Sequence, residues 1–115
     1  MIFKQYEIWL ADLNPQFGTE SGKIRPVLIV QTDFLNLVNH SSVIICPITT
    51  NIVQGAKILR VHLKAETSSL QKDYDIMIDQ IRAIDTKRLL RKLGELSEKS
   101  EREVVTNLLI VLNLK

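Results

Sequence analysis

Apolar and polar residues alternate in short stretches along most of the chain. Alternation over about four to eight residues is typical of a β-strand that buries one face. We therefore expect strands over residues 6–12, 27–31, 43–49, 57–63, 75–85 and 92–96. Pro47 falls inside the third of these. Because proline has no amide hydrogen for a strand ladder, it predicts an edge or a bulge there.

The pattern changes to helical spacing near the C-terminus. Ser97 is a suitable N-cap, Ser100 with Glu103 matches a capping box, and Thr86 is suited to capping a short turn that runs to Leu90. Apolar residues then recur at helical spacing to about residue 113: Val104, Val105, Leu108, Leu109, Val111 and Leu112. Many short strands followed by one helix indicate a mostly β (α+β) fold, a small barrel or sandwich.

Proline and glycine interrupt the strand pattern between the first two strands. Asn14-Pro15, Phe17-Gly18 and Gly22 fall within residues 13–24, which show no strong periodicity. Loops of this length in a compact domain are often functional. We therefore expect this segment to carry part of a site.

A hairpin of the second and third strands would bring two distant polar residues together. In an antiparallel pair closed by a loop over residues 32–41, the start of one strand lies beside the end of the other. Arg25 and Thr49 are placed symmetrically about Leu37, in the middle of that loop. The geometry predicts that a guanidinium and a hydroxyl meet at one end of the sheet, where the loop of residues 13–24 also enters.

Composition limits the class of protein. The 115 residues are 45% hydrophobic and 24% charged, which suits one packed domain over residues 1–115. The net charge of +2 permits a polyanionic partner but lacks the dense basic face of a general DNA-binding protein. The start of the chain is too short and polar for a signal peptide, and no apolar run has the length of a membrane span. We expect a cytoplasmic protein.

Cysteine and histidine usage adds no metal chemistry. Cys46 is the single cysteine and lies in an apolar run, so no disulfide within the chain forms and a buried thiol is expected. No second cysteine or histidine stands at metal-ligand spacing, which excludes a zinc site. His40 and His62 are interpreted as surface residues.

Phosphoryl transfer is the chemistry that Arg25 and Thr49 fit. An RNA 2′-hydroxyl that attacks its neighbouring phosphate needs its proton removed, the leaving oxygen protonated and the phosphoryl charge stabilised. Arg25 can bind two phosphoryl oxygens at once, and Thr49 can donate a hydrogen bond to them. Glu20, in the adjoining loop, is a candidate base or an orienting group for Arg25.

The same residues carry a family resemblance. Three motifs in order, followed by the helix after Leu96, resemble the MazF/PemK toxins over essentially the whole chain. The motifs are residues 8–14 with Pro15, Gly18, Glu20, Gly22 and Arg25-Pro26; residues 43–49, ending Pro47-Ile48-Thr49; and residues 79–85.

This resemblance implies a dimer of SH3-like barrels that cuts single-stranded RNA at short sequences. It implies 2′,3′-cyclic phosphate and 5′-hydroxyl ends, no metal or other cofactor, and an antitoxin partner that covers the RNA groove with a flexible acidic segment. Arg25 and Thr49 match the catalytic positions of the family. Because arginine is a reluctant base, we favour charge stabilisation as its role. The resemblance places RNA contacts at four positions: Phe17, Gly18, Thr50 and Gln80.

These residues also have purely structural interpretations. Arg25 would be a strand-end residue paired with Glu20, and Thr49 an ordinary strand residue. Glu20 would only orient Arg25 or lie in solvent. Phe17 and Gln80 would pack on the barrel. Outside the site, we expect Trp9 in the core or a dimer interface, and residues 87–92 to form a solvated basic face rather than a nucleic-acid patch.

Two other functions compete with RNA cleavage. The first is a gyrase poison on the same fold, like the CcdB toxins, which act through the end of the C-terminal helix. The helix here lacks the terminal tryptophan of those poisons, and Arg25 and Thr49 would have no use. The second is a catalytically inactive binding module, which would be expected to lose one of these two residues.

Overall fold

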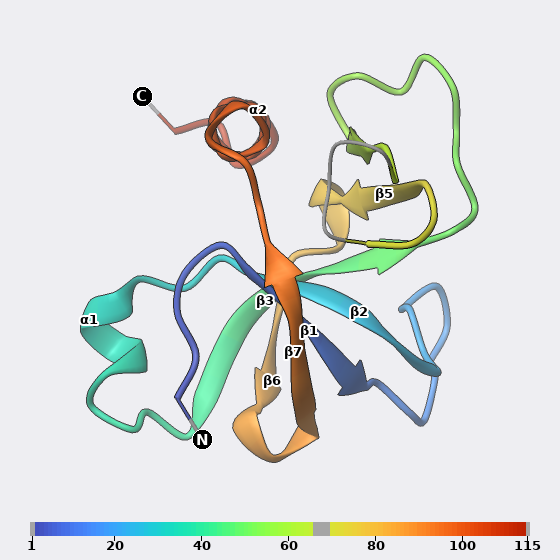
Figure 1. Ribbon diagram of the computed structural model, residues 1–115. Coiled ribbons are helices and arrows are strands. Elements are labelled where there is room, and N and C mark those ends of the chain that lie inside the picture. Colours follow the sequence, from blue (N-terminus) through green and yellow to red (C-terminus); the bar gives the residue numbers. More distant parts are fainter. Residues whose placement is uncertain (1, 66–69, 115) are drawn as a thin grey trace.

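An antiparallel sheet and one long helix make up most of the structure (Figure 1). This computed structural model describes residues 2–65 and 70–114. The strands are β1 (Glu7–Asp12), β2 (Ile24–Ile29), β3 (Ser42–Thr49), β4 (Arg60–Leu63), β5 (Tyr74–Met77), β6 (Arg82–Asp85) and β7 (Leu89–Glu95). The helices are α1 (Asp33–Asn36), α2 (Glu98–Val111) and the 3-10 turns η1 (Ile78–Gln80) and η2 (Thr86–Arg88).

The sheet follows the order β4-β5-β3-β2-β1-β7, and β6 also pairs with β3. All of its pairs are antiparallel. This arrangement confirms the mostly β class with a C-terminal helix. The expected barrel is not closed, because β4 and β7 stand at the two ends of this order and do not pair with each other.

β3 is paired along one side by two successive strands instead of one. Its first half pairs with β6, from Ser42 opposite Asp85, and its end pairs with β5, at Thr49 opposite Asp75. The register between these pairings shifts by three residues, the length of η1. The single strand predicted over residues 75–85 is therefore wrong. Pro47 lies opposite this interruption, where its missing amide hydrogen costs no ladder bond on that side.

Two separate clusters form the hydrophobic core. β1 contributes to both, because Trp9 and Ala11 face one cluster and Ile8 faces the other. Trp9 is 6% exposed and meets Phe3 edge-on at 6.3 Å, which confirms its expected place in the core. Val104 joins α2 to the second cluster, which also buries Cys46. The core therefore lies on both faces of the sheet, with α2 covering one of them.

The helix ends follow the sequence with two differences. The Ser97 side chain accepts a hydrogen bond from the Ser100 amide at 3.2 Å, which confirms Ser97 as the N-cap of α2. Ser100 lies inside the helix, so the capping box expected with Glu103 is wrong. Asp85, not Thr86, caps η2. None of the helices in the described part of the chain has the length and apolar content needed to cross a bilayer.

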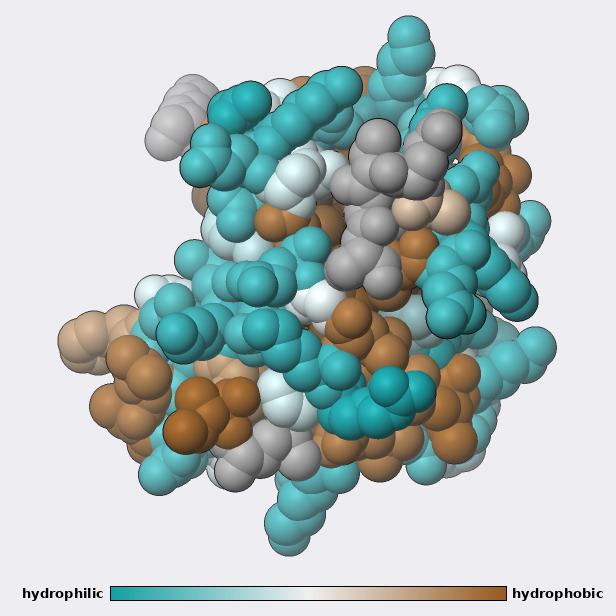
Figure 2. Space-filling view, viewed as in Figure 1, coloured by the Kyte–Doolittle hydropathy of each residue, from teal (hydrophilic) through white to brown (hydrophobic). Residues whose placement is uncertain are grey.

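α1 was not predicted from the sequence. Its four residues are too few for a periodic pattern, and Thr32 caps it through a hydrogen bond from the Phe34 amide. Phe34 and Leu37 stand 79% and 67% exposed. Figure 2 shows this end of the molecule as an apolar area. The helix shortens the loop between β2 and β3 without covering the core.

Candidate active site

The β2–β3 hairpin has the register that the sequence predicts. Its pairs run from Ile29 opposite Ile45 to Val27 opposite Pro47, symmetrically about residue 37. Arg25 and Thr49 each lie two residues beyond the last of these pairs. Both line one hollow of about 590 Å³. The structure thus brings together the two residues that the hairpin argument selected.

Residues of the loop after β1, of the segment after β3 and of β5 form the rest of this hollow. Its lining also includes Gln16, Thr19, Glu20, Ser21, Lys23, Thr50, Asn51 and Tyr74. Most of these side chains are polar, and the charged ones are Lys23, Arg25 and Glu20. A polar hollow with a basic centre suits a phosphate-bearing ligand.

Arg25 is held at one nitrogen and open at two others. Its Nε donates a hydrogen bond to the Gly22 carbonyl at 2.8 Å. Within residues 2–65 and 70–114, Arg25 makes no ion pair with Glu20 or any other carboxylate. The structure therefore does not show the pairing with Glu20 that a purely structural role for Arg25 would require. Partial burial lowers the pKa of the guanidinium by desolvation. A partly desolvated cation without a counter-ion is a ready site for an anion.

Thr49 has its hydroxyl oxygen fixed by the backbone. The Asn51 amide donates to Thr49 Oγ1 at 3.1 Å. The hydroxyl keeps its own hydrogen for donation to a ligand. Thr50, the next residue, is exposed and lines the same hollow.

The predicted RNA contacts on the loop differ in their surroundings. Phe17 is 80% exposed, so it does not pack against the sheet. Gly18 has a φ of 58°, in the left-handed region that glycine adopts easily. Glu20 lines both the main hollow and a second one of about 340 Å³ beside Gln80. Of these three residues, Glu20 lines the hollow that contains Arg25, whereas Phe17 and Gly18 lie between two of its lining residues, Gln16 and Thr19.

Gln80 has a role that the sequence did not predict. Its Oε1 accepts hydrogen bonds from the amide of Ser21 at 3.1 Å and from the Ser21 hydroxyl at 2.5 Å. Ser21 is buried, although it lies in the polar loop. Gln80 therefore anchors the loop after β1 to η1. Its Nε2 makes no hydrogen bond to the part of the chain that the structure describes, and Gln80 lines the second hollow.

Two other predicted surface features are partly structural. Arg88, in the basic segment 87–92, donates from Nη1 to the Asp12 and Asn14 carbonyls at 2.9 and 2.5 Å. Lys92 pairs with Glu7 at 3.0 Å. His40 is exposed as expected, and His62 also reaches the surface, with 34% of its side chain exposed, but it contacts buried Asp75 as well. No sequence motif marked the His62 contact.

The family is decided by comparison of the whole chain. A family model described as PemK-like, MazF-like toxin of type II toxin-antitoxin system matches residues 4–112. The chain belongs to this family. An endoribonuclease MazF of Staphylococcus saprophyticus is 40% identical over 105 residues, which cover 90% of this chain and 85% of that relative.

Solved structures of MazF proteins share the fold. MazF from Deinococcus radiodurans superposes with a TM-score of 0.82 at 24% identity, covering 98% of both chains. A MazE-MazF complex from the same organism gives a TM-score of 0.77 at 23% identity, covering 100% of this chain and 99% of that chain. The open, bent sheet with its C-terminal helix is thus the MazF fold.

Proposed function

We propose that this MazF-family chain is a sequence-specific endoribonuclease that cuts single-stranded RNA, mRNA included, and so stops translation and growth. The observation that supports the proposal is the placement of Arg25 and Thr49 in one polar hollow at the end of the β2–β3 hairpin. The 40% identity to an endoribonuclease MazF supports the same activity. We propose one toxin domain over residues 1–115, acting in the cytoplasm.

The proposed reaction is attack of a 2′-oxygen on the adjacent phosphorus. A new bond forms between them, the bond from phosphorus to the 5′-oxygen breaks, and that oxygen takes up a proton. The products are a 2′,3′-cyclic phosphate and a 5′-hydroxyl. The two open Nη groups of Arg25 bind the phosphoryl oxygens, where negative charge builds up in the transition state. Thr49 donates from its hydroxyl to the same oxygens.

The candidates for the general base that removes the 2′-proton are Glu20 and Arg25. Glu20 is an exposed carboxylate at the wall of the hollow, which suits a base. Arg25 has a pKa lowered by burial, yet a guanidinium remains a poor base. We therefore assign charge stabilisation to Arg25. No metal or other cofactor enters the proposed reaction.

RNA bases are proposed to bind around this centre. Phe17 offers an exposed ring for stacking, and Gly18 lets the backbone beside it approach the RNA closely. Thr50 lines the hollow itself. Gln80 has a free amide nitrogen that can donate to a base edge.

Two protein partners are proposed, a second copy of the chain and a MazE-like antitoxin with a flexible acidic segment. A MazE-MazF complex from Deinococcus radiodurans supports the antitoxin. Val105 and Leu109 of α2 and its C-cap Leu112 form an apolar strip that is 40–45% exposed, which a partner chain would cover. Light scattering at micromolar concentration should give twice the 13.2 kDa of one chain. A mass of one chain only would contradict the dimer.

Incubation with a long single-stranded RNA in EDTA tests the activity. The wild type should cut the RNA at a few short sequences and leave cyclic phosphate ends, while Arg25→Ala and Thr49→Ala should leave it intact. Intact RNA together with arrested gyrase would instead support the CcdB-like poison, which the family match does not favour. No effect in either assay would indicate an inactive binding module.

A further inference from the structure

Asp75 places a carboxylate where solvent does not reach it. It lies on β5, and its side chain is 0% exposed. Burial of an ionised carboxylate is strongly unfavourable unless the group is both paired and hydrogen-bonded. The residues that follow Asp75 are apolar: Ile76, Met77 and Ile78. An ionised carboxylate at this buried position therefore needs specific hydrogen-bonding partners.

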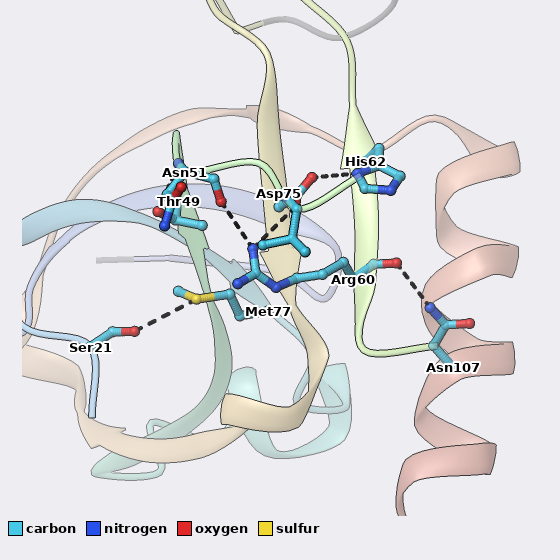
Figure 3. A network of polar contacts seen from close by, with 9 residues as sticks. Ser21, Thr49, Asn51, Arg60, His62, Asp75, Met77 and Asn107 are labelled. Atoms are coloured by element: carbon cyan, nitrogen blue, oxygen red, sulfur yellow. Dashed lines mark hydrogen bonds and ion pairs between the residues drawn. The ribbon is translucent and has the colours of Figure 1, made fainter. Parts of the chain in front are cut away.

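Three groups surround the Asp75 carboxylate, and Figure 3 shows two of them, His62 and Arg60. Oδ1 lies 2.5 Å from His62 Nδ1. Oδ2 accepts from Arg60 Nη1 at 3.1 Å and from the Val53 amide at 2.9 Å. His62 and Arg60 come from β4, the strand beside β5. Both carboxylate oxygens are therefore satisfied, and one of the partners is a backbone amide outside the sheet.

Two of these contacts lead to the same segment. Arg60 Nη1 also donates to the Asn51 carbonyl at 3.1 Å, so Asp75 reaches residues 51 and 53 through one direct and one bridged bond. Residues 50–53 lie in neither a helix nor a strand. In a strand, backbone groups bond to a neighbouring strand. Here the Asp75 and Arg60 side chains bond the Val53 amide and the Asn51 carbonyl instead.

This segment forms one wall of the hollow that contains Arg25. Thr50 and Asn51 both line it. Thr49 is the register partner of Asp75 across β3 and β5, and the Asn51 amide donates to the Thr49 hydroxyl oxygen at 3.1 Å. A chain of contacts therefore runs from buried Asp75 through Asn51 to Thr49.

We propose that Asp75, acting with Arg60, is a positioning residue for RNA cleavage that fixes residues 50–53 beside the Thr49 hydroxyl. It touches no substrate, and it acts by holding Thr49 and the Thr50–Asn51 wall in one arrangement. This role rests on the proposed endoribonuclease function. Because Thr50 in this wall is a proposed RNA contact, Asp75 would also restrict which RNA sequences are cut.

Asp75→Asn, with Asp73→Asn as its matched control, tests the proposal. Asparagine keeps the size and one acceptor oxygen of aspartate but removes the ion pair with Arg60. Asp73 lies two residues away and is exposed, and its carboxylate accepts from the Ala65 amide at 2.8 Å. The measurements are kcat and KM on one cut RNA, the set of cut sites on a long RNA, and hydrogen exchange at the Val53 amide.

For Asp75→Asn we expect kcat to fall about 10- to 100-fold with KM changed less than about threefold, since small misplacements of reacting groups cost this much in rate. Exchange at Val53 should accelerate at least about tenfold, and new cut sites should appear. Asp73→Asn should match the wild type in all three. Arg60→Lys, which keeps the charge but not the planar fork, should show the same changes in a weaker form. If Asp75→Asn does not fold, the same three measurements on Arg60→Lys test the proposal.

Faster exchange at Val53 with unchanged kcat and cut sites would overturn the positioning role. Equal effects of Asp73→Asn and Asp75→Asn would also overturn it, because the contacts to residues 51 and 53 would then be irrelevant. Failure of the proposed function is distinguishable, since it requires that the wild type itself cuts no RNA.

Discussion

Arg25 on β2 and Thr49 on β3 each lie two residues beyond the pair of Val27 and Pro47, at the same end of one hairpin. Each is held by its own backbone neighbour, Arg25 by the Gly22 carbonyl and Thr49 by the Asn51 amide. The hairpin register brings the two side chains to one hollow, and local hydrogen bonds orient them. Pre-organised donors of this kind stabilise developing charge without reorganising during the reaction.

Removal of either side chain should therefore reduce cleavage much more than it reduces stability. We expect kcat to fall about 100- to 1000-fold for Arg25→Ala and for Thr49→Val, the loss typical of one aimed donor. Arg25→Lys should also be poorly active, because an ammonium cannot bind two phosphoryl oxygens in a fixed fork. Single-turnover RNA cleavage measures these rates. Arg91→Ala, at an exposed position on β7, is the control and should cut at the wild-type rate.

Gly22 should tolerate no side chain. A Cβ at this position would lie 2.4 Å from Gln16 Cβ and 3.0 Å from Gln16 Cα, so the loop after β1 would have to move. Because Arg25 Nε binds the Gly22 carbonyl, that movement reaches the site. Gly22→Ala should lower both the melting temperature and kcat.

Gly18→Ala provides the comparison for Gly22→Ala. A Cβ at Gly18 meets nothing within 4 Å, and only its φ of 58° is strained, which costs about 1 kcal/mol. Thermal unfolding of both variants measures the difference. A smaller loss for Gly22→Ala than for Gly18→Ala would contradict the close contact with Gln16.

Cys46 should make the protein less stable in alkali. Burial raises the pKa of its thiol from 9.0 to about 12. Between these values the unfolded chain loses the thiol proton while the folded chain keeps it, so the free energy of unfolding falls as pH rises. By pH 10.5 the loss from this group should be about 2 kcal/mol.

Urea unfolding at pH 8 and pH 10.5 measures this loss, with Cys46→Ala as the reference. The variant has a cavity and should be less stable at pH 8, but its stability should fall less between the two pH values. Equal falls for both proteins would show that the thiol ionises as easily in the folded chain as in the unfolded one.

Glu7 should stabilise the fold above its folded pKa and not below it. Burial opposes its charge, but hydrogen bonds from the Trp9 indole, the Lys4 amide and Lys92 outweigh this and lower its pKa below 4.5. A lowered folded pKa means that stability is present above pH 4.5 and is lost as pH falls through the folded value. Glu7→Gln should therefore cost about 1–2 kcal/mol at pH 7.

The same cost should shrink as the pH is lowered from 7 to 3, because the stabilisation is lost as the wild-type carboxyl takes up a proton. Urea unfolding of wild type and Glu7→Gln at the two pH values gives the comparison. A constant difference would assign the effect of the substitution to packing around Trp9 instead of to charge.

The parts of the site that depend on one hairpin were predictable from sequence. Two apolar runs and the loop between them determined the register, and the register determined where Arg25 and Thr49 meet. The Pro/Gly pattern of residues 13–24 likewise predicted a loop at the same end. Both predictions depend on strands that follow one another in the chain, so a single loop fixes how they pair.

Contacts between strands that are distant in sequence were not predictable. The alternation over residues 75–85 gave no sign of η1, because Ile78 and Ile81 continue an apolar pattern through the turn. Ser21 and Gln80 meet only once η1 lies beside the loop after β1. Asp75 offered one usable signal, a charged residue at the start of an otherwise apolar run, but its partners depend on the pairing of β4 with β5.

Attack by the 2′-oxygen is the central step of this account, and one substitution in the RNA tests it directly. An oligonucleotide that the wild type cuts at one position is compared with the same RNA carrying a 2′-deoxy nucleotide on the 5′ side of that position. We predict that the deoxy RNA stays intact in EDTA and still competes for binding. Cleavage of the deoxy RNA at the same position would contradict it.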